Sequence, residues 1–120
     1  MSAKVLFVDD EEEIRALMTL NFQSMGLVVD TASSGSEALS VLKNHTYDLI
    51  VSDVKMANGS GIDLLKELNV RGSKTPFVFL TAYLDLDGKK LLEMGALKVF
   101  YKPTKFSEIE NFIKQTLDIK

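Results

Sequence analysis

The stretch Asp48-Leu-Ile-Val-Ser-Asp53 decides the fold that this sequence predicts. Its three consecutive apolar residues, Leu49, Ile50 and Val51, are typical of a strand that is buried on both faces. Strands of this kind lie in the middle of a parallel sheet. The stretch ends on the carboxylate of Asp53, and open α/β sheets bind their ligands at the carboxyl ends of the strands. Asp53 therefore stands where chemistry is expected, provided that other polar residues converge on it.

The pattern of a strand followed by a helix occurs five times along the chain. The expected strands cover residues 4–8, 28–31, 48–53, 77–80 and 99–101, and the expected helices cover about 14–25, 34–44, 62–68, 86–94 and 109–116. The second helix begins with the capping-box pattern Ser34-Gly-Ser-Glu37. We predict an α/β fold: a flavodoxin-like, doubly wound sheet of five parallel strands in the order 2-1-3-4-5, with five helices.

Composition excludes several classes of protein. The length of 120 residues predicts one domain, residues 1–120. The composition, with 46% hydrophobic and 26% charged residues, is ordinary for a globular protein. The net charge of −3 provides no general attraction to nucleic acid or to an anionic membrane. The absence of cysteine excludes disulfides and thiolate metal sites. The N-terminus lacks a signal-peptide pattern and no apolar run approaches about 18 residues, so we expect a cytoplasmic protein without membrane insertion.

Polar residues stand at the carboxyl ends of four of the five expected strands. These residues are Asp9 and Asp10 after the first strand, Asp53 after the third, Thr81 at the end of the fourth and Lys102 after the fifth. The carboxyl ends of parallel strands meet at one edge of the sheet, and the order 2-1-3-4-5 places the first and third strands side by side. The three aspartates are therefore expected to lie together.

Three carboxylates in one crevice repel one another, so they must shift their pKa values or hold a cation. Oxygen ligands without histidine or cysteine suit Mg²⁺ or Mn²⁺. A carboxylate can also attack a phosphoryl group and form an acyl phosphate. The metal and Lys102 would neutralise the charge of that group, and the Thr81 hydroxyl could donate to it. The residue types at these strand ends thus predict a phosphoryl-acceptor site.

The motifs of this chain resemble those of the receiver domains of two-component response regulators, of the chemotaxis-type stand-alone kind. The matching segments are Val8-Asp9-Asp10, Asp53-Val-Lys-Met56 with Gly61, Thr81-Ala82, Gly95-Ala96 and Lys102-Pro103. The resemblance implies that Asp53 accepts a phosphoryl group from the phosphohistidine of a sensor histidine kinase or a histidine phosphotransfer protein. It also implies that Asp9, Asp10, Asp53 and the Lys55 backbone carbonyl hold Mg²⁺. Thr81 would be the switch hydroxyl, Lys102 would contact the phosphate, and the Lys102–Pro103 bond would be cis.

The sequence departs from the family pattern at a few positions. Ala57 stands where the family usually has proline, which predicts a more mobile loop after the acceptor. Val99 stands where the family places a switch aromatic. Phe100 faces the other side of the sheet, whereas Tyr101 shares the face of Val99 and lies nearer the site. We therefore expect a different, smaller conformational response. Lys55 and Tyr83 occupy positions that modulate hydrolysis of the acyl phosphate in the family.

The function predicted from these features is a signalling module of a phosphorelay and not an enzyme that turns over a substrate. It would catalyse only its own phosphorylation and autodephosphorylation, and it would act through contacts with a downstream target protein as a monomer or weak dimer. Two alternatives stay open: a receiver-like interaction module with a vestigial site, and a small Mg²⁺-dependent phosphohydrolase. A flavin site is disfavoured because the loop after the first strand is acidic and would repel a phosphate.

Overall fold

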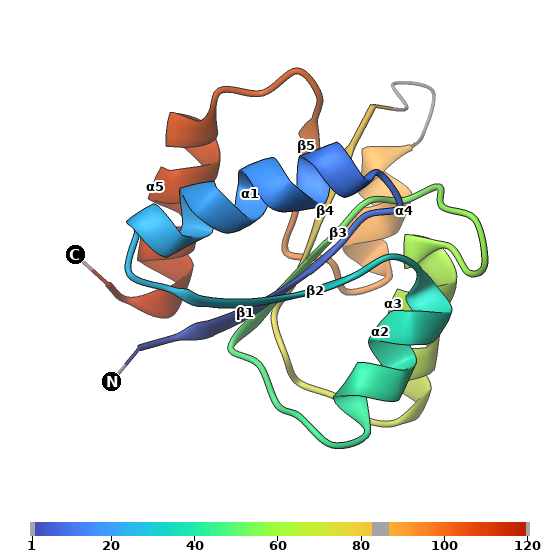
Figure 1. The fold of residues 1–120 in the computed structure, drawn as a ribbon. Helices are drawn as coiled ribbons and strands as arrows, with labels where there is room; N and C mark the ends of the chain where they lie inside the picture. The colour runs from blue at the N-terminus through green and yellow to red at the C-terminus, as the bar shows by residue number, and fades with distance from the viewer. Residues whose placement is uncertain (1, 83–86, 120) are drawn as a thin grey trace.

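The computed structural model describes residues 2–82 and 87–119. Five parallel strands form one sheet in the order β2-β1-β3-β4-β5, which confirms the predicted topology (Figure 1). The strands are β1 (Lys4–Val8), β2 (Val28–Ala32), β3 (Leu49–Ser52), β4 (Phe77–Thr81) and β5 (Lys98–Tyr101). The helices are α1 (Glu12–Ser24), α2 (Gly35–Leu42), α3 (Gly61–Val70), α4 (Gly88–Glu93) and α5 (Phe106–Leu117).

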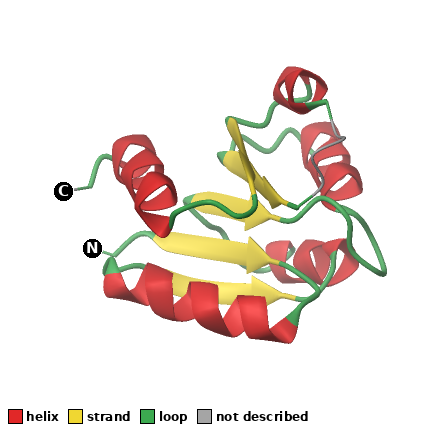
Figure 2. Cartoon of the chain, turned by 90° about the horizontal axis from the view of Figure 1, so that it is seen from above, coloured by secondary structure: helices red, strands yellow, loops and turns green. Residues whose placement is uncertain are grey.

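Helices cover both faces of the sheet, as Figures 1 and 2 show. One hydrophobic cluster joins the sheet to α1 and α5, and the other joins it to α2, α3 and α4. The central strand β3 supplies both clusters, because Leu49 and Val51 face α1 and α5 while Ile50 faces the opposite side. All three side chains are fully buried, so the expectation of a strand buried on both faces is confirmed.

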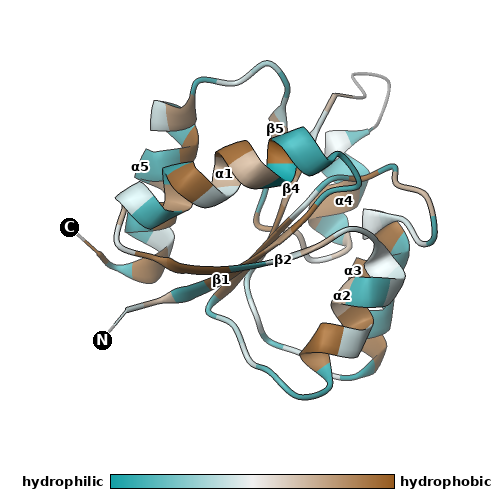
Figure 3. Cartoon of the chain, viewed as in Figure 1, coloured by the Kyte–Doolittle hydropathy of each residue, from teal (hydrophilic) through white to brown (hydrophobic). Residues whose placement is uncertain are grey.

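Colouring by hydropathy separates the apolar interior from the polar outer faces of the helices (Figure 3). The strands β1, β3 and β4 are almost completely buried, whereas β2 is partly exposed and lies at the edge of the sheet. This agrees with the amphipathic pattern of residues 28–31. In the described part of the chain, none of the helices has the length and apolar character needed to cross a membrane.

The ends of the helices follow from local chemistry. The Ser34 hydroxyl accepts the Glu37 N–H and starts α2, as the capping pattern predicts. The fourth helix is shorter than the expected 86–94, and Leu86 lies outside the described residues. Asp87 accepts the Lys89 N–H as an N-cap, and the described part of α4 begins at Gly88.

Strand β5 confirms the expected alternation of its side chains. Val99 packs against the cluster of α2, α3 and α4, whereas Phe100 is buried in the cluster of α1 and α5. The face that Val99 shares with Tyr101 is thus the face that α4 covers.

Candidate functional site

Backbone hydrogen bonds bring the ends of β1 and β3 together. The Asp53 N–H donates to the Val8 carbonyl oxygen at 2.9 Å, which extends the parallel ladder by one residue beyond β3. The Asp9 N–H likewise donates to the Ala32 carbonyl oxygen at 3.1 Å. Asp9 and Asp53 therefore leave adjacent strands at the same level of the sheet.

The three aspartates form one compact acidic cluster. Asp9, Asp10 and Asp53 each offer a carboxylate oxygen, and these oxygens all lie within 4.8 Å of one another. Asp9 is fully buried and Asp53 is 5% exposed, whereas Asp10 is exposed. The Lys102 ammonium lies 3.2 Å from Asp9 Oδ2 and 3.5 Å from Asp53 Oδ2. The structure thus places four of the predicted site residues in direct contact or close proximity.

The protonation behaviour of the cluster reflects its burial. Burial raises the pKa of the Asp53 carboxyl above its ordinary value, although the Lys102 ammonium and the Val54 N–H act in the opposite direction. Burial alone would lower the pKa of Lys102, but the carboxylates of Asp53 and Asp9 outweigh it and raise that pKa. An ionised Asp53 is therefore costly in this site, and a further cation would relieve the cost.

Backbone N–H groups hold each carboxylate of the cluster. Val54 N–H donates to Asp53 Oδ1 at 2.7 Å, Glu11 N–H to Asp9 Oδ1 at 2.9 Å, and Ala57 N–H to Asp10 Oδ2 at 3.3 Å. These donors come from three separate loop positions and orient the carboxylates before any ligand binds.

Residues around the cluster include some that sequence reasoning missed. The Arg15 guanidinium donates to the Asp9 carbonyl oxygen at 2.8 Å, and Glu11 and Ile14 line the cavity beside the cluster. The contact between Glu11 N–H and Asp9 has a sequence signal, since aspartate often accepts the N–H two residues later. The contact of Arg15 has none, because the spacing of α1 indicates only a polar position.

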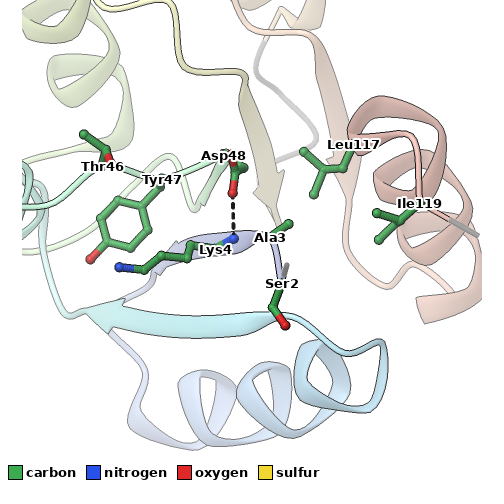
Figure 4. A pocket seen from close by; sticks show the side chains of 8 residues that line it. All are labelled: Ser2, Ala3, Lys4, Thr46, Tyr47, Asp48, Leu117 and Ile119. Atoms are coloured by element: carbon green, nitrogen blue, oxygen red, sulfur yellow. Dashed lines mark hydrogen bonds between the residues drawn. The ribbon is translucent and has the colours of Figure 1, made fainter.

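A cavity of about 470 Å³ opens beside the cluster. Its lining includes Asp10, Asp53, Lys55, Ala82 and Lys102. The predicted residues Asp9 and Thr81 are both fully buried and are not part of this lining. A larger cavity of about 590 Å³ lies at the opposite end of the sheet, where Lys4 N–H donates to Asp48 Oδ2 and Tyr47 stands alongside (Figure 4).

Thr81 is adjacent to Tyr101 in the parallel ladder between β4 and β5. The Lys102 N–H donates to the Thr81 carbonyl oxygen at 2.7 Å, so the strand end that carries Lys102 is fixed against the one that carries Thr81. The Tyr101 hydroxyl lies against Gly88, where a Cβ would approach it to 2.5 Å. The peptide bond between Lys102 and Pro103 is cis, as the resemblance implied. Tyr83 lies outside the described residues.

The cluster fits a hard divalent cation. Its ligands are carboxylate oxygens that converge within the 4.8 Å separation noted above, and the ion pairs of Lys102 join it to only two of the three carboxylates in the described part of the chain. Mg²⁺ is bound by such oxygen ligands and keeps some of its waters. Lys55 also lines the cavity, two residues after Asp53 along the chain.

Comparison with known proteins matches residues 5–114 to the family described as the response regulator receiver domain. This chain belongs to that family. Receiver domains are signalling modules of two-component systems and not enzymes that turn over a substrate, and the aspartate cluster with which the family accepts a phosphoryl group is present in this chain.

The relatives of this receiver domain differ in length. It is 34% identical to sporulation initiation phosphotransferase F of Bacillus subtilis, covering 100% of this chain and 98% of that protein. It is 38% identical to the alkaline phosphatase synthesis transcriptional regulatory protein PhoP of Bacillus subtilis, covering 98% of this chain but 49% of that protein. Against the response regulator protein PilR of Pseudomonas aeruginosa, the chain spans only 26% of the relative, at 31% identity over 98% of its own length.

Two solved structures share the architecture of this chain. The response regulator protein TrrA of Thermotoga maritima, in complex with Mg²⁺ and BeF, superimposes with a TM-score of 0.87 at 31% identity. The match covers 97% of this chain and 99% of that one. The receiver domain of a Francisella response regulator superimposes with a TM-score of 0.89 at 31% identity and covers 98% of both chains.

Proposed function

We propose that Asp53 is the phosphoryl acceptor of this receiver domain, with a phosphohistidine as the donor. The observation that carries the proposal is the position of its carboxylate, nearly buried at the edge of the cavity, within 4.8 Å of two further carboxylates and 3.5 Å from the Lys102 ammonium. A nucleophile in such a site reaches a phosphoryl group while solvent water is largely excluded.

The two oxygens of Asp53 have different roles in this proposal. Oδ1 accepts the Val54 N–H at 2.7 Å and fixes the plane of the carboxylate. Oδ2 attacks phosphorus, the P–N bond to the donor imidazole breaks, and its electron pair returns to that imidazole. The products are an acyl phosphate on Asp53 and a histidine that takes up a proton from water. Hydrolysis of the acyl phosphate by water restores the carboxylate and releases phosphate.

Lys102 and the remaining acids prepare the charge for this transfer. The Lys102 ammonium pairs with Asp9 and Asp53 before transfer, so it already stands where the anionic phosphoryl oxygens arrive. Asp9, Asp10, Asp53 and the Lys55 carbonyl would hold Mg²⁺, or Mn²⁺ in its place. When bound, the cation supplies neutralisation of the phosphoryl charge.

Thr81 and Tyr101 are the side chains through which we propose that the new phosphoryl group is sensed. Thr81 ends the strand next to β3, and Tyr101 is its register partner on β5. Val99, the position of the usual switch aromatic, is a small apolar residue that packs into the core. Movement of the Thr81 hydroxyl would therefore reach α4 through Tyr101, since Gly88 begins that helix.

The partners follow from this chemistry. We propose that the donor is a sensor histidine kinase or a histidine phosphotransfer protein and that the phosphorylated domain, as a monomer or weak dimer, binds a downstream target protein. We also propose that the domain acts in the cytoplasm. Direct binding to nucleic acid is not part of the proposal, as the chain carries a net charge of −3.

Intact-mass measurement after incubation with Mg²⁺ and acetyl phosphate tests the proposal. We expect one added phosphoryl group in the parent protein and none in Asp53→Asn. An unmodified parent, or a modified Asp53→Asn variant, would contradict it, and steady release of phosphate from small esters would favour a phosphohydrolase instead. Substitution of Lys55 or Tyr83 is expected to change the lifetime of the acyl phosphate, measured by the decay of the added mass.

A further inference from the structure

The loop that follows the acceptor strand contributes a contact that neither composition nor motif predicts. Ala57 N–H donates to Asp10 Oδ2 at 3.3 Å, although the two residues are 47 positions apart. Proline, which the family usually has at this position, lacks an N–H and cannot make this bond. We propose that the Ala57 N–H is a positioning donor that holds Asp10 in the arrangement needed for Mg²⁺. This inference rests on the proposed metal site of the phospho-acceptor.

The charges of the cluster give this donor a function. Among residues 2–82 and 87–119, Lys102 is ion-paired with the buried carboxylates of Asp9 and Asp53 but not with Asp10. Asp10 is exposed and is repelled by both of those carboxylates, so its side chain is driven toward solvent. A backbone N–H aimed at Oδ2 opposes that motion and leaves Oδ1 for the metal.

The donor is itself held by the rest of the loop. At the base of the loop, where its two ends meet, the Gly61 N–H donates to the Val54 carbonyl oxygen at 2.7 Å. At its tip, the carbonyl oxygens of Asn58 and Gly59 accept N–H groups from the first turn of α2, at 3.3 Å from Ser36 and 2.9 Å from Gly35. Hydrogen bonds hold the loop on both sides of Ala57. The Ala57 N–H therefore keeps its position when the Asp10 carboxylate moves.

Loss of this donor is expected to weaken Mg²⁺ binding by about three- to fivefold. The estimate lies in the range of an ordinary hydrogen bond and below that of a bond to a charged group, because the N···O distance of 3.3 Å is long and the contact is exposed. Without this N–H, the Asp10 side chain adopts orientations that do not suit the metal. The free energy needed to restore the right orientation on binding lowers the affinity.

Isothermal titration of the metal-free protein with MgCl₂ alone tests the inference. Ala57→Pro removes the N–H, and replacement of the Ala57 amide by an ester removes the N–H without adding a ring. Ala57→Ser is the matched control, since it retains the N–H and changes the same position. We expect weaker Mg²⁺ binding in the proline and ester variants and parent-like binding in Ala57→Ser.

Other results would overturn the inference. If the ester variant binds Mg²⁺ as tightly as the parent, or if Ala57→Pro binds more tightly, then loop stiffness and not the donor governs the site. If the parent protein itself does not bind Mg²⁺, the proposed metal site fails together with this inference. If the parent binds Mg²⁺ and all variants bind it equally well, the inference is wrong but the proposed function still stands.

Discussion

Substitution of Gly61 by alanine is expected to destabilise the domain strongly and to displace the acceptor. Gly61 is the first residue of α3, and alanine is in general the better helix former. In this fold, a Cβ at position 61 would overlap the carbonyl oxygen of Asp53, and it would lie 2.9 Å from the Ser52 hydroxyl oxygen and 3.0 Å from a ring carbon of Phe79. Tertiary packing therefore reverses the expectation from helix propensity.

The size of the effect follows from what has to move. Overpacking in a core costs about 1–3 kcal/mol when side chains can yield, but here the obstacle is the backbone of the acceptor itself. Separating the two segments would also break the hydrogen bond between the Gly61 N–H and the Val54 carbonyl oxygen, worth about 1 kcal/mol. The free energy of unfolding should fall by about 3–5 kcal/mol, a large part of the stability of a domain of this size.

Urea unfolding followed by circular dichroism measures this loss. Gly72→Ala is the matched control, because a Cβ there meets nothing within 4 Å and only the positive φ of 73° opposes it. The strain of that conformation should cost about 1–2 kcal/mol. The reasoning fails if Gly61→Ala is no less stable than Gly72→Ala. Phosphorylation by acetyl phosphate should also slow in Gly61→Ala molecules that remain folded.

Further predictions concern the acidic cluster and the start of α4. Because burial raises the pKa of Asp53, the ionised form of this side chain opposes folding. The stability that the protonated carboxyl contributes is therefore fully present below the pKa of the unfolded state. It is lost as pH rises through the higher pKa of the folded state. In EDTA, Asp53→Asn should therefore be more stable than the parent by about 1 kcal/mol at pH 7. Urea unfolding should show that this difference disappears in acid. A difference that does not depend on pH would contradict the prediction. Gly88→Ala should cost about 1 kcal/mol through contact with the Tyr101 hydroxyl, and Tyr101→Phe should relieve it, which a double-mutant cycle of thermal unfolding measures. Additive effects of the two changes would show that the contact carries no energy.

The sequence predicts the sheet because the burial of each strand is reflected in its pattern of apolar and polar residues. Leu49, Ile50 and Val51 are consecutive and apolar because helices cover both faces of β3, and the partly polar residues 28–31 indicate an edge strand. The apolar spacing alone does not show that the Asp87 carboxylate accepts the Lys89 N–H, which caps α4.

The acidic cluster could be anticipated from strand ends alone, because the carboxyl ends of parallel strands converge wherever the topology is regular. Asp9, Asp10, Asp53 and Lys102 are therefore determined as neighbours by the sequence pattern and the strand order. The complete burial of Thr81, which keeps it out of the cavity lining, was not determined in this way, as it depends on how the end of β4 packs.

Only the tertiary structure decided which groups orient these side chains. The N–H of Ala57 reaches Asp10, the Tyr101 hydroxyl lies against Gly88, and Gly61 admits no side chain beside Asp53. Each contact joins segments that are distant in sequence or depends on the path of a loop that has no periodic pattern. The sequence by itself determined the chemistry gathered at the edge of the sheet, because strand ends are local features. The geometry that makes the chemistry usable depends on loop conformation, which only packing against the rest of the chain determines.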